Sequence, residues 1–240
     1  MVSKNQIKLI TSLQQKKYRK QHQLFLAEGK KVIQELLDAN YELEVLFSTD
    51  VSFPSVDKLK FHTITENELK KITALTTPND CLALFKIPLE KELVNSGLIL
   101  MLDDVRDPGN LGTIIRLCDW FGIETLICSE ATVDVYNPKV VQATMGSISR
   151  VNVIYANLIE SLNKIDLPVF GTFMDGENIY QQKMPNEGVI VMGNEANGIS
   201  KQVEELISKR IAIPRFGKLK QTESLNVATA TAIILSEFRR

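Results

Sequence analysis

The second half of the chain alternates short apolar runs with segments of helical periodicity, and this alternation constrains its fold more than any other feature. Apolar runs such as "GLILML" and "GVIVMGN" recur from residue 97 onward, and helical patterns separate them. Strands joined by helices pair in parallel, and the helices cover both faces of the sheet. The sequence therefore predicts an α/β fold whose ligands bind beyond the carboxyl ends of the strands, where the strand order reverses.

A smaller α/β unit is expected in front of this sheet. Residues 3–20 carry apolar side chains at helical spacing, and "LFLAEG", "LEVLFST" and "CLALFKI" have the composition of strands. The alternation stops at the charged, turn-rich "PLEKELVNSG" (88–97), and 240 residues suffice for two domains. We therefore expect one domain over 1–92 and a second over 93–240.

The first 31 residues are strongly basic, although the whole chain has a net charge of −1. They hold eight lysines and arginines against a single acid, Glu28. Such a segment is either a solvated helix or a footprint for the phosphates of a nucleic acid. The candidate RNA contacts are Lys16, Lys17, Arg19 and Lys20.

Histidine and cysteine are too sparse for most hydrolase or metal chemistry. The chain has only His22 and His62, and the spacing of Cys81, Cys118 and Cys128 matches no metal or redox motif. We therefore expect no bound metal. The sequence also has no long apolar run and no signal-peptide core at its start, so a cytoplasmic location is expected.

The loop after the first apolar run of the second half is "DDVRDPGNLGTIIR" (103–116). Pro108-Gly109 predicts a turn, and Asn110 occupies the expected N-cap of a helix over 111–121. Arg116 follows one to two helical turns later. Taken alone, the pattern also suits an ordinary turn and helix cap whose arginine pairs with a nearby aspartate.

Two later loops also carry polar groups where strands end. In "VIVMGNEANGIS", Glu195 follows a buried strand, and the glycines allow close backbone approach. In "IAIPRFGKLKQTESLN" (211–226), Glu223, Ser224 and Asn226 precede a helix of small residues. Free N–H groups at such a helix start favour an anion or a ligand carbonyl. Each loop alone also suits a plain connection between a strand and a helix.

Together the three loops form a specific signature: Asn-x5-Arg, then Gly-Asn-Glu-x2-Gly, then Ile-Pro-x9-Ser-Leu-Asn-Val-Ala. This order resembles the three motifs of the SpoU (TrmH) family of RNA ribose 2′-O-methyltransferases, in the SPOUT superfamily, and the resemblance covers roughly residues 95–240. The front domain, with "RKQHQLFLAEGKKVIQELL", resembles the substrate-binding domain of many members, which is itself similar to a small ribosomal-protein fold.

The resemblance implies a deep trefoil knot, a bound S-adenosylmethionine and a homodimer. On the resemblance, the adenine would lie around Thr172, around Met192, Gly193 and Asn194, and along residues 211–225. By position, Gly193, Ile213 and Leu225 match cofactor contacts of the family. S-adenosylmethionine carries no phosphate, so a phosphate-binding G-x-G-x-x-G loop is not needed to hold it. Ala196 stands where the family usually has glycine, and it would cost about 1 kcal/mol if the position required a positive φ.

The resemblance also assigns catalytic roles. Arg116 matches the family's catalytic arginine. A guanidinium keeps its proton in a protein, so we expect Arg116 to stabilise the developing alkoxide and the adjacent phosphate rather than to act as a base. Asn110 would orient Arg116 or the ribose. Glu195, Ser224 and Asn226 would shape the site and fix the acceptor.

The front domain favours ribosomal RNA as the substrate of such an enzyme. A tRNA ribose methyltransferase remains an alternative. So does an RNA-binding or ribosome-assembly protein that keeps the fold without catalysis, although the intact motif residues count against it. A nucleotide-binding oxidoreductase is disfavoured because the dinucleotide fingerprint is missing.

Overall fold

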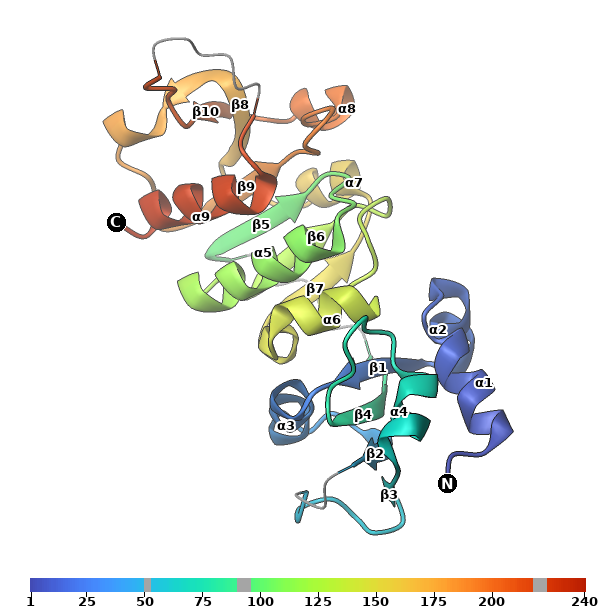
Figure 1. Cartoon of the computed structure of the whole chain (residues 1–240). Coiled ribbons are helices and arrows are strands. Elements are labelled where there is room, and N and C mark those ends of the chain that lie inside the picture. The colour runs from blue at the N-terminus through green and yellow to red at the C-terminus, as the bar shows by residue number, and fades with distance from the viewer. Residues whose placement is uncertain (50–52, 90–95, 218–223) are drawn as a thin grey trace. The chain divides into compact units, whose positions relative to one another are not determined.

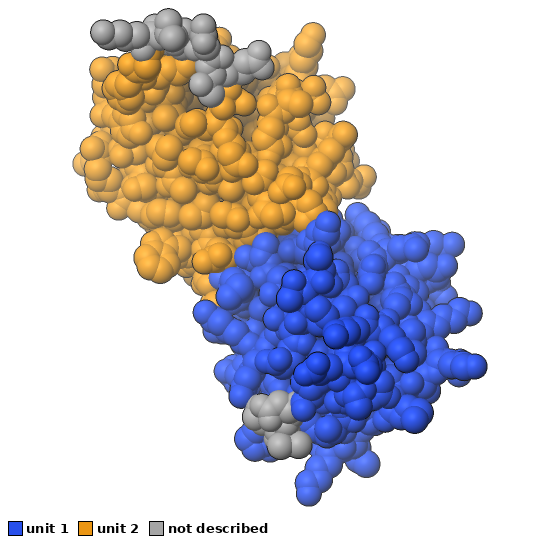
Figure 2. Space-filling model, in the orientation of Figure 1, with its two compact units in different colours: residues 1–89, 134–149 blue, residues 90–133, 150–240 orange. Residues whose placement is uncertain are grey.

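The computed structural model of the chain is shown in Figure 1, and it describes residues 1–49, 53–89, 96–217 and 224–240. They form two compact units, coloured separately in Figure 2: unit 1 is 1–89 with 134–149, and unit 2 is 90–133 with 150–240. The domain boundary expected between residues 92 and 93 lies outside the described residues. That boundary stays a prediction.

Unit 1 is built on a four-stranded mixed sheet with the order β1-β4-β2-β3. Its strands are β1 (Leu24–Glu28), β2 (Leu43–Ser48), β3 (Phe61–Thr63) and β4 (Cys81–Lys86). Strand β4 runs antiparallel to both of its neighbours, whereas β2 and β3 are parallel. All five residues of β1 are buried, which explains the apolar run over residues 24–27, and the last of them, Glu28, is a buried carboxyl.

Helices cover both faces of this sheet. On one face, α1 (Lys4–Ser12) and α4 (Glu66–Ile72) share an apolar core with the side chains of β1, β2 and β4. On the other face lie α3 (Lys30–Asp38) and α6 (Pro138–Thr144). There the ring of Phe25 on β1 contacts Tyr41 and Tyr136, so residues from the second half of the chain help to build unit 1.

Two of the helices expected in this unit are broken. The helix expected over 3–20 is divided into α1 and α2 (Lys16–His22), because the backbone of Gln15 is extended. The helix expected over 137–150 ends at Met145, where φ is positive, and a 3-10 turn η1 (Ser147–Ser149) follows. Gly146 fits this turn because an added Cβ would lie 2.7 Å from the side chain of Glu35.

Unit 2 contains a six-stranded sheet with the order β10-β8-β9-β5-β6-β7. Its strands are β5 (Leu98–Leu102), β6 (Thr125–Cys128), β7 (Asn152–Tyr155), β8 (Val169–Asn178), β9 (Gly188–Met192) and β10 (Lys209–Ala212). Every pairing is parallel. The predicted parallel α/β sheet is therefore confirmed, and the central strands β5 and β9 are buried throughout.

Helices lie on both faces of this sheet (Figure 1). The short helices α7 (Leu158–Leu162) and α8 (Lys201–Glu204) share a core with alternate residues of β5 and β9. On the other face, α5 (Pro108–Phe121) packs against α9 (Val227–Phe238). The ring of Phe238 meets Phe170 of β8 edge-on at 5.1 Å. No helix in the described part of the chain is long and apolar enough to cross a membrane.

The edge of the sheet formed by β8 and β10 is irregular. Strand β10 pairs first with Phe170 and Gly171, and then with residues 177–178 of β8. Gly176 lies where the two strands approach most closely, since an added Cβ would come within 2.5 Å of the Ile211 carbonyl carbon. A further 3-10 turn, η2 (Ile179–Gln181), follows β8.

Candidate active site

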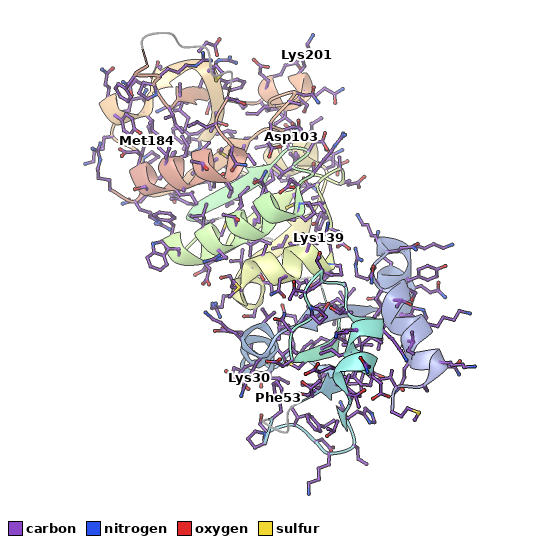
Figure 3. All side chains as sticks on the ribbon, viewed as in Figure 1. Lys30, Phe53, Asp103, Lys139, Met184 and Lys201 are labelled. Carbon is purple, nitrogen blue, oxygen red and sulfur yellow. The ribbon has the colours of Figure 1, made fainter. Side chains whose placement is uncertain are left out.

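The loops after β5 and β9 emerge side by side from the sheet. Strands β5 and β9 are neighbours, and the strand order reverses between them, which is where parallel sheets bind ligands. Asp103, labelled in Figure 3, directly follows β5, and its Oδ2 accepts a 2.7 Å hydrogen bond from the backbone N–H of Ser200. Its own N–H donates to the carbonyl of Met192 at 2.9 Å. These two bonds hold the first and second motif loops together.

The first motif helix begins earlier than the sequence suggested. Asp107, not Asn110, is the N-cap of α5, because its carboxylate accepts the N–H of Asn110 at 2.8 Å. Pro108 takes the first helical position, where its fixed φ fits and its missing N–H costs nothing. The expectation that Asn110 caps the helix was wrong. The amide of Asn110 is therefore left for other contacts.

A chain of hydrogen bonds joins the three motif loops. The amide Nδ2 of Asn110 donates to Oε1 of Glu195, 85 residues further along. The Oδ1 of Asn110 accepts from Nδ2 of Asn226 at 2.9 Å. Asn226 also caps α9, because its Oδ1 accepts the N–H groups of Ala228 and Thr229. Three of the five predicted catalytic residues thus come together, one from each motif.

Arg116 is not part of this chain of hydrogen bonds. It lies six residues beyond Asn110, which places it about 120° around the helix axis. Its side chain is exposed and makes no hydrogen bond or ion pair with any residue that the structure describes. The alternative pairing with an aspartate is also not found there, since the carboxylate of Asp119 binds Arg150 and that of Asp103 accepts the N–H of Ser200.

A cavity of about 1260 Å³ lies beside the Asn110–Glu195–Asn226 chain of hydrogen bonds. Glu195 and Ser224 line it, together with residues 172–174 within β8, residues at and after the ends of β9 and β10, and the start of α9. All six residues predicted to bind the cofactor also line it, namely Thr172, Met192, Gly193, Asn194, Ile213 and Leu225. Loops that are widely separated in the sequence therefore form one concave site. Glu223, which we had grouped with Ser224, lies outside the described residues.

The cavity wall suits a ligand with an apolar ring system. Most of its side chains are apolar, and two of them, Met174 and Leu225, are 56% and 46% exposed. A bound ring would cover both and remove their surface from water. The described residues contain no cluster of histidine, cysteine, aspartate or glutamate that would hold a metal ion.

Sequence comparison identifies the family of the chain. Residues 97–236, more than half of the chain, match the model of the SpoU rRNA Methylase family. This chain belongs to the SpoU rRNA methylase family. Residues 4–83 match the model of the MRM3-like substrate binding domain. Both parts of the resemblance seen in the sequence are thereby confirmed.

Relatives of this SpoU-family chain match it over nearly its whole length. The 23S rRNA (guanosine(2553)-2′-O)-methyltransferase RlmP of Bacillus subtilis (strain 168) is 31% identical over 99% of this chain and 97% of its own. A TrmH-family protein of Porphyromonas gingivalis has a solved structure with a TM-score of 0.90 and 40% identity, over 100% and 98% of the two chains. The structure of the AdoMet-bound rRNA methyltransferase of Sinorhizobium meliloti has a TM-score of 0.87 and 28% identity, over 100% of this chain and 96% of its own.

The second SpoU motif is held in shape by its own backbone and side chains. An added Cβ at Gly193 would lie 2.3 Å from the carbonyl carbon of Gly198, so the close pairing of residues 194 and 198 requires glycine. The Asn194 side chain accepts the N–H groups of residues 196 and 197 and donates to the carbonyl of Asp104. Ala196 is not among the described residues with positive φ, so its methyl group adds no such strain.

Two residues of the first SpoU motif escaped the sequence analysis. Asp107 could have been found, since an aspartate before a proline at a helix start is a known capping pattern. No sequence pattern around Asp104 indicates its role in shaping the loop. Its φ is +61°, and its carboxylate takes two hydrogen bonds from Arg106, which raise the pKa of that guanidinium. These contacts fix the loop between β5 and α5.

The predicted RNA contacts of the basic segment divide into two kinds. Lys16, Lys17 and Lys20 are exposed on α2. Arg19 is only 2% exposed, and its guanidinium pairs with Asp134 and donates to the carbonyls of Leu13 and Gln14 at 2.8 and 3.0 Å. Because its donors are used inside unit 1, the structure does not support Arg19 as an RNA contact.

Proposed function

We propose that this protein transfers a methyl group from S-adenosylmethionine to a ribose 2′-hydroxyl of ribosomal RNA. The observation that carries the proposal is the hydrogen-bonded Glu195–Asn110–Asn226 chain beside the large cavity. Membership of the SpoU family and the rRNA methyltransferases among its relatives support the same reaction. Ribosomal RNA is favoured over tRNA because RlmP, an enzyme of 23S rRNA, matches both parts of the chain.

The cofactor would occupy the cavity, held by the middle of β8 and by the loops after β9 and β10. When bound, S-adenosylmethionine supplies a methyl group activated by its sulfonium. Ile213 and Leu225 offer apolar surface to the adenine, and the backbone of residues 192–194 offers polar groups. The cavity is larger than the ~300–1,000 Å³ usual for a single small ligand, so an acceptor nucleoside can share it.

The acceptor ribose would bind at the Glu195 end of the cavity. Asn110 holds one carboxylate oxygen of Glu195, and the other is available to accept a hydrogen bond from the 2′-hydroxyl. Ser224 is exposed on the same cavity and offers a hydroxyl to the sugar. Because Asn226 fixes Asn110 from the far side, the group that orients Glu195 is itself held rigidly. Such positioning supplies a large part of the rate of a group transfer.

Arg116 would stabilise the negative charge that develops on the ribose oxygen, and we propose that it does so in a homodimer. It is exposed, lies about 120° around α5 from Asn110, and takes no part in the hydrogen-bonded chain of its own subunit. In a two-fold symmetric dimer, Arg116 of the partner subunit can complete the site. A guanidinium stays protonated, so a phosphate oxygen of the RNA or the free oxygen of Glu195 would take the proton.

Mixing two inactive variants tests this dimer. If Arg116 acts across the interface, heterodimers of Arg116→Ala and Glu195→Gln contain one intact site. Co-expressed subunits should then recover about a quarter of wild-type methyl transfer, because half of the random dimers carry one of two sites. No recovery, with dimers confirmed by sedimentation, would place Arg116 and Glu195 in the same subunit's site.

The finer features of the fold belong to the same proposal. A trefoil knot formed by the second and third motifs is supported by the two-part pairing of β8 with β10 and by the close approach of Gly176 to Ile211. A ribosomal-protein-like fold for the front domain is supported by its mixed four-stranded sheet. The cytoplasm is the expected location of an enzyme that acts on ribosomal RNA.

Mapping ribose methylation in a strain without the gene tests the proposed function. The rRNA should lack one 2′-O-methyl group that the parent strain carries, and a plasmid copy of the gene should restore it. A copy with Glu195→Gln should not restore it. An unchanged ribose methylation map of all rRNA would contradict an rRNA substrate, and a change confined to tRNA would reassign it.

A further inference from the structure

The outward face of α2 carries aromatic rings as well as lysines. Tyr18 and His22 are one helical turn apart, and their rings are nearly parallel, with 6.5 Å between centroids and 20° between planes. The ammonium group of Lys17 lies 5.8 Å from the centre of the Tyr18 ring. His22 is exposed and Tyr18 is half-buried, so both rings retain surface that faces solvent.

The opposite side of α2 is anchored inside unit 1. Arg19 is buried beneath the helix, where it pairs with Asp134 and donates to the carbonyls of Leu13 and Gln14 just beyond the end of α1. A helix of seven residues has little stability alone, so these contacts determine its position. The two rings therefore stand on a fixed support, which lowers the entropy lost when a ligand covers them.

We propose that Tyr18 and His22 form a stacking platform for unpaired bases of the RNA substrate, flanked by the lysines that bind its phosphates. The inference rests on the proposed function, since it names which part of an RNA this surface recognises. Aromatic rings beside exposed cations match a single strand, because its bases are free to stack on a side chain while its phosphates meet the lysines. A duplex keeps its bases stacked on each other and leaves the rings unused.

Stacking and phosphate binding differ in their dependence on salt. Each lysine that binds a phosphate releases counterions, so its removal flattens the salt dependence of the affinity. A stacking ring releases none, so its removal weakens binding by a constant factor at every salt concentration. The salt dependence of the affinity therefore distinguishes the contribution of the two rings from that of the lysines around them.

The experiment measures the affinity of the full chain for fluorescein-labelled oligoadenylate of about 20 nucleotides, single-stranded or paired with oligouridylate, over a series of KCl concentrations. The test variants are Tyr18→Leu with His22→Ala, and His22→Ala alone. The double variant Lys17→Gln with Lys20→Gln measures the contribution of the lysine charges, for comparison with the aromatic variants. His62→Ala is the matched control, because His62 also stacks on an aromatic ring, Phe47, but lies on β3.

The double aromatic variant should bind the single strand about tenfold more weakly with an unchanged salt slope, and should bind the duplex like wild type. The lysine variant should flatten the slope for both RNAs, and His62→Ala should change nothing. If the double aromatic variant has a lowered melting temperature, its weaker binding could reflect lost stability. The His22→Ala variant, which changes only an exposed side chain, then tests the platform by itself. Unchanged single-strand affinity, or equal losses for both RNAs, would overturn the platform. A wild-type protein that binds neither RNA and methylates no rRNA would instead refute the proposed function.

Discussion

Arg19 on α2 and Arg116 on α5 are placed in opposite ways in their two units. Arg19 is buried, pairs with Asp134 and gives further hydrogen bonds to two backbone carbonyls. Arg116 is exposed and has no partner among the described residues. An arginine whose donors are satisfied inside the protein stabilises the fold, whereas one with open donors is free to meet an anion. The difference assigns a structural role to the first and a chemical role to the second.

Replacing Arg19 should give the largest effect, and the effect should be on stability. In Arg19→Met the carboxylate of Asp134, only 14% exposed, loses its charged partner, and breaking a buried pair in this way typically costs about 3–5 kcal/mol. Thermal unfolding should therefore begin at a markedly lower temperature. The double variant Arg19→Met with Asp134→Leu should recover much of the loss, because no buried charge is left unpaired. Wild-type stability of Arg19→Met would show that the pair is not formed in solution.

Replacing Arg116 should leave the fold intact and remove the chemistry. Arg116→Ala should lower the rate of methyl transfer about 100- to 1000-fold, as expected when a preorganised donor to a developing charge is lost. Its melting temperature should match wild type, and calorimetry should find cofactor affinity within a few-fold. A large loss of cofactor binding would move Arg116 into the cofactor site and weaken the contrast with Arg19.

Asn226 has both a structural role, as the cap of α9, and a role in the active site, through its hydrogen bond to Asn110. Two substitutions separate these roles. Asn226→Asp keeps the side-chain oxygen that caps α9 but loses the N–H donor to Asn110. Methyl transfer should fall in this variant with little change in stability. Asn226→Ala loses both contacts, so its free energy of unfolding should also fall by about 1 kcal/mol. Equal activity of Asn226→Asp and wild type would remove Asn226 from the site.

The smallest effect concerns Glu28 in unit 1. Its buried carboxyl accepts hydrogen bonds from Thr73 and Ala74, but burial dominates and raises its pKa above 4.5. A raised pKa means that the folded state binds the proton more tightly. Wild type should therefore lose stability as the pH rises from 4.5 through the folded pKa.

Glu28→Gln should not lose stability over that pH range, because its side chain is neutral at every pH. Melting temperatures measured from pH 4 to 8 for both proteins test this expectation. Glu187→Gln, at an exposed site in unit 2, is the control and should follow wild type. A wild-type protein that gains stability relative to Glu28→Gln as the pH rises would contradict the raised pKa.

The fold was predictable wherever local pattern determines structure. The apolar runs of β5 and β9 identify buried parallel strands, and the three motifs identify loops that meet at their carboxyl ends. All six residues predicted to bind the cofactor line one cavity, although their contacts with a cofactor stay a prediction. The start of α5 was missed because Asn110 and Asp107 are both good capping residues, and only the structure shows which one accepts the bond.

Contacts between distant segments were not predictable. Arg19 and Asp134 are 115 residues apart, and no pattern near either residue indicates the pairing. The same holds for the packing of α6 on β1, which brings residues 134–149 into unit 1. Burial of a charged side chain depends on its tertiary partner, whereas a basic helix looks the same in sequence whether it binds RNA or the protein itself.

The central claim is that this chain methylates the ribose of rRNA, and radiolabelled methyl transfer tests it most directly. The purified protein would be incubated with S-adenosylmethionine labelled in its methyl group and rRNA from a strain lacking the gene. A 2′-O-methyl group blocks alkaline cleavage of the adjacent phosphodiester, so the label should remain in alkali-resistant dinucleotides. Label released in mononucleotides, which marks a methylated base, or no label in the RNA at all, would contradict the account.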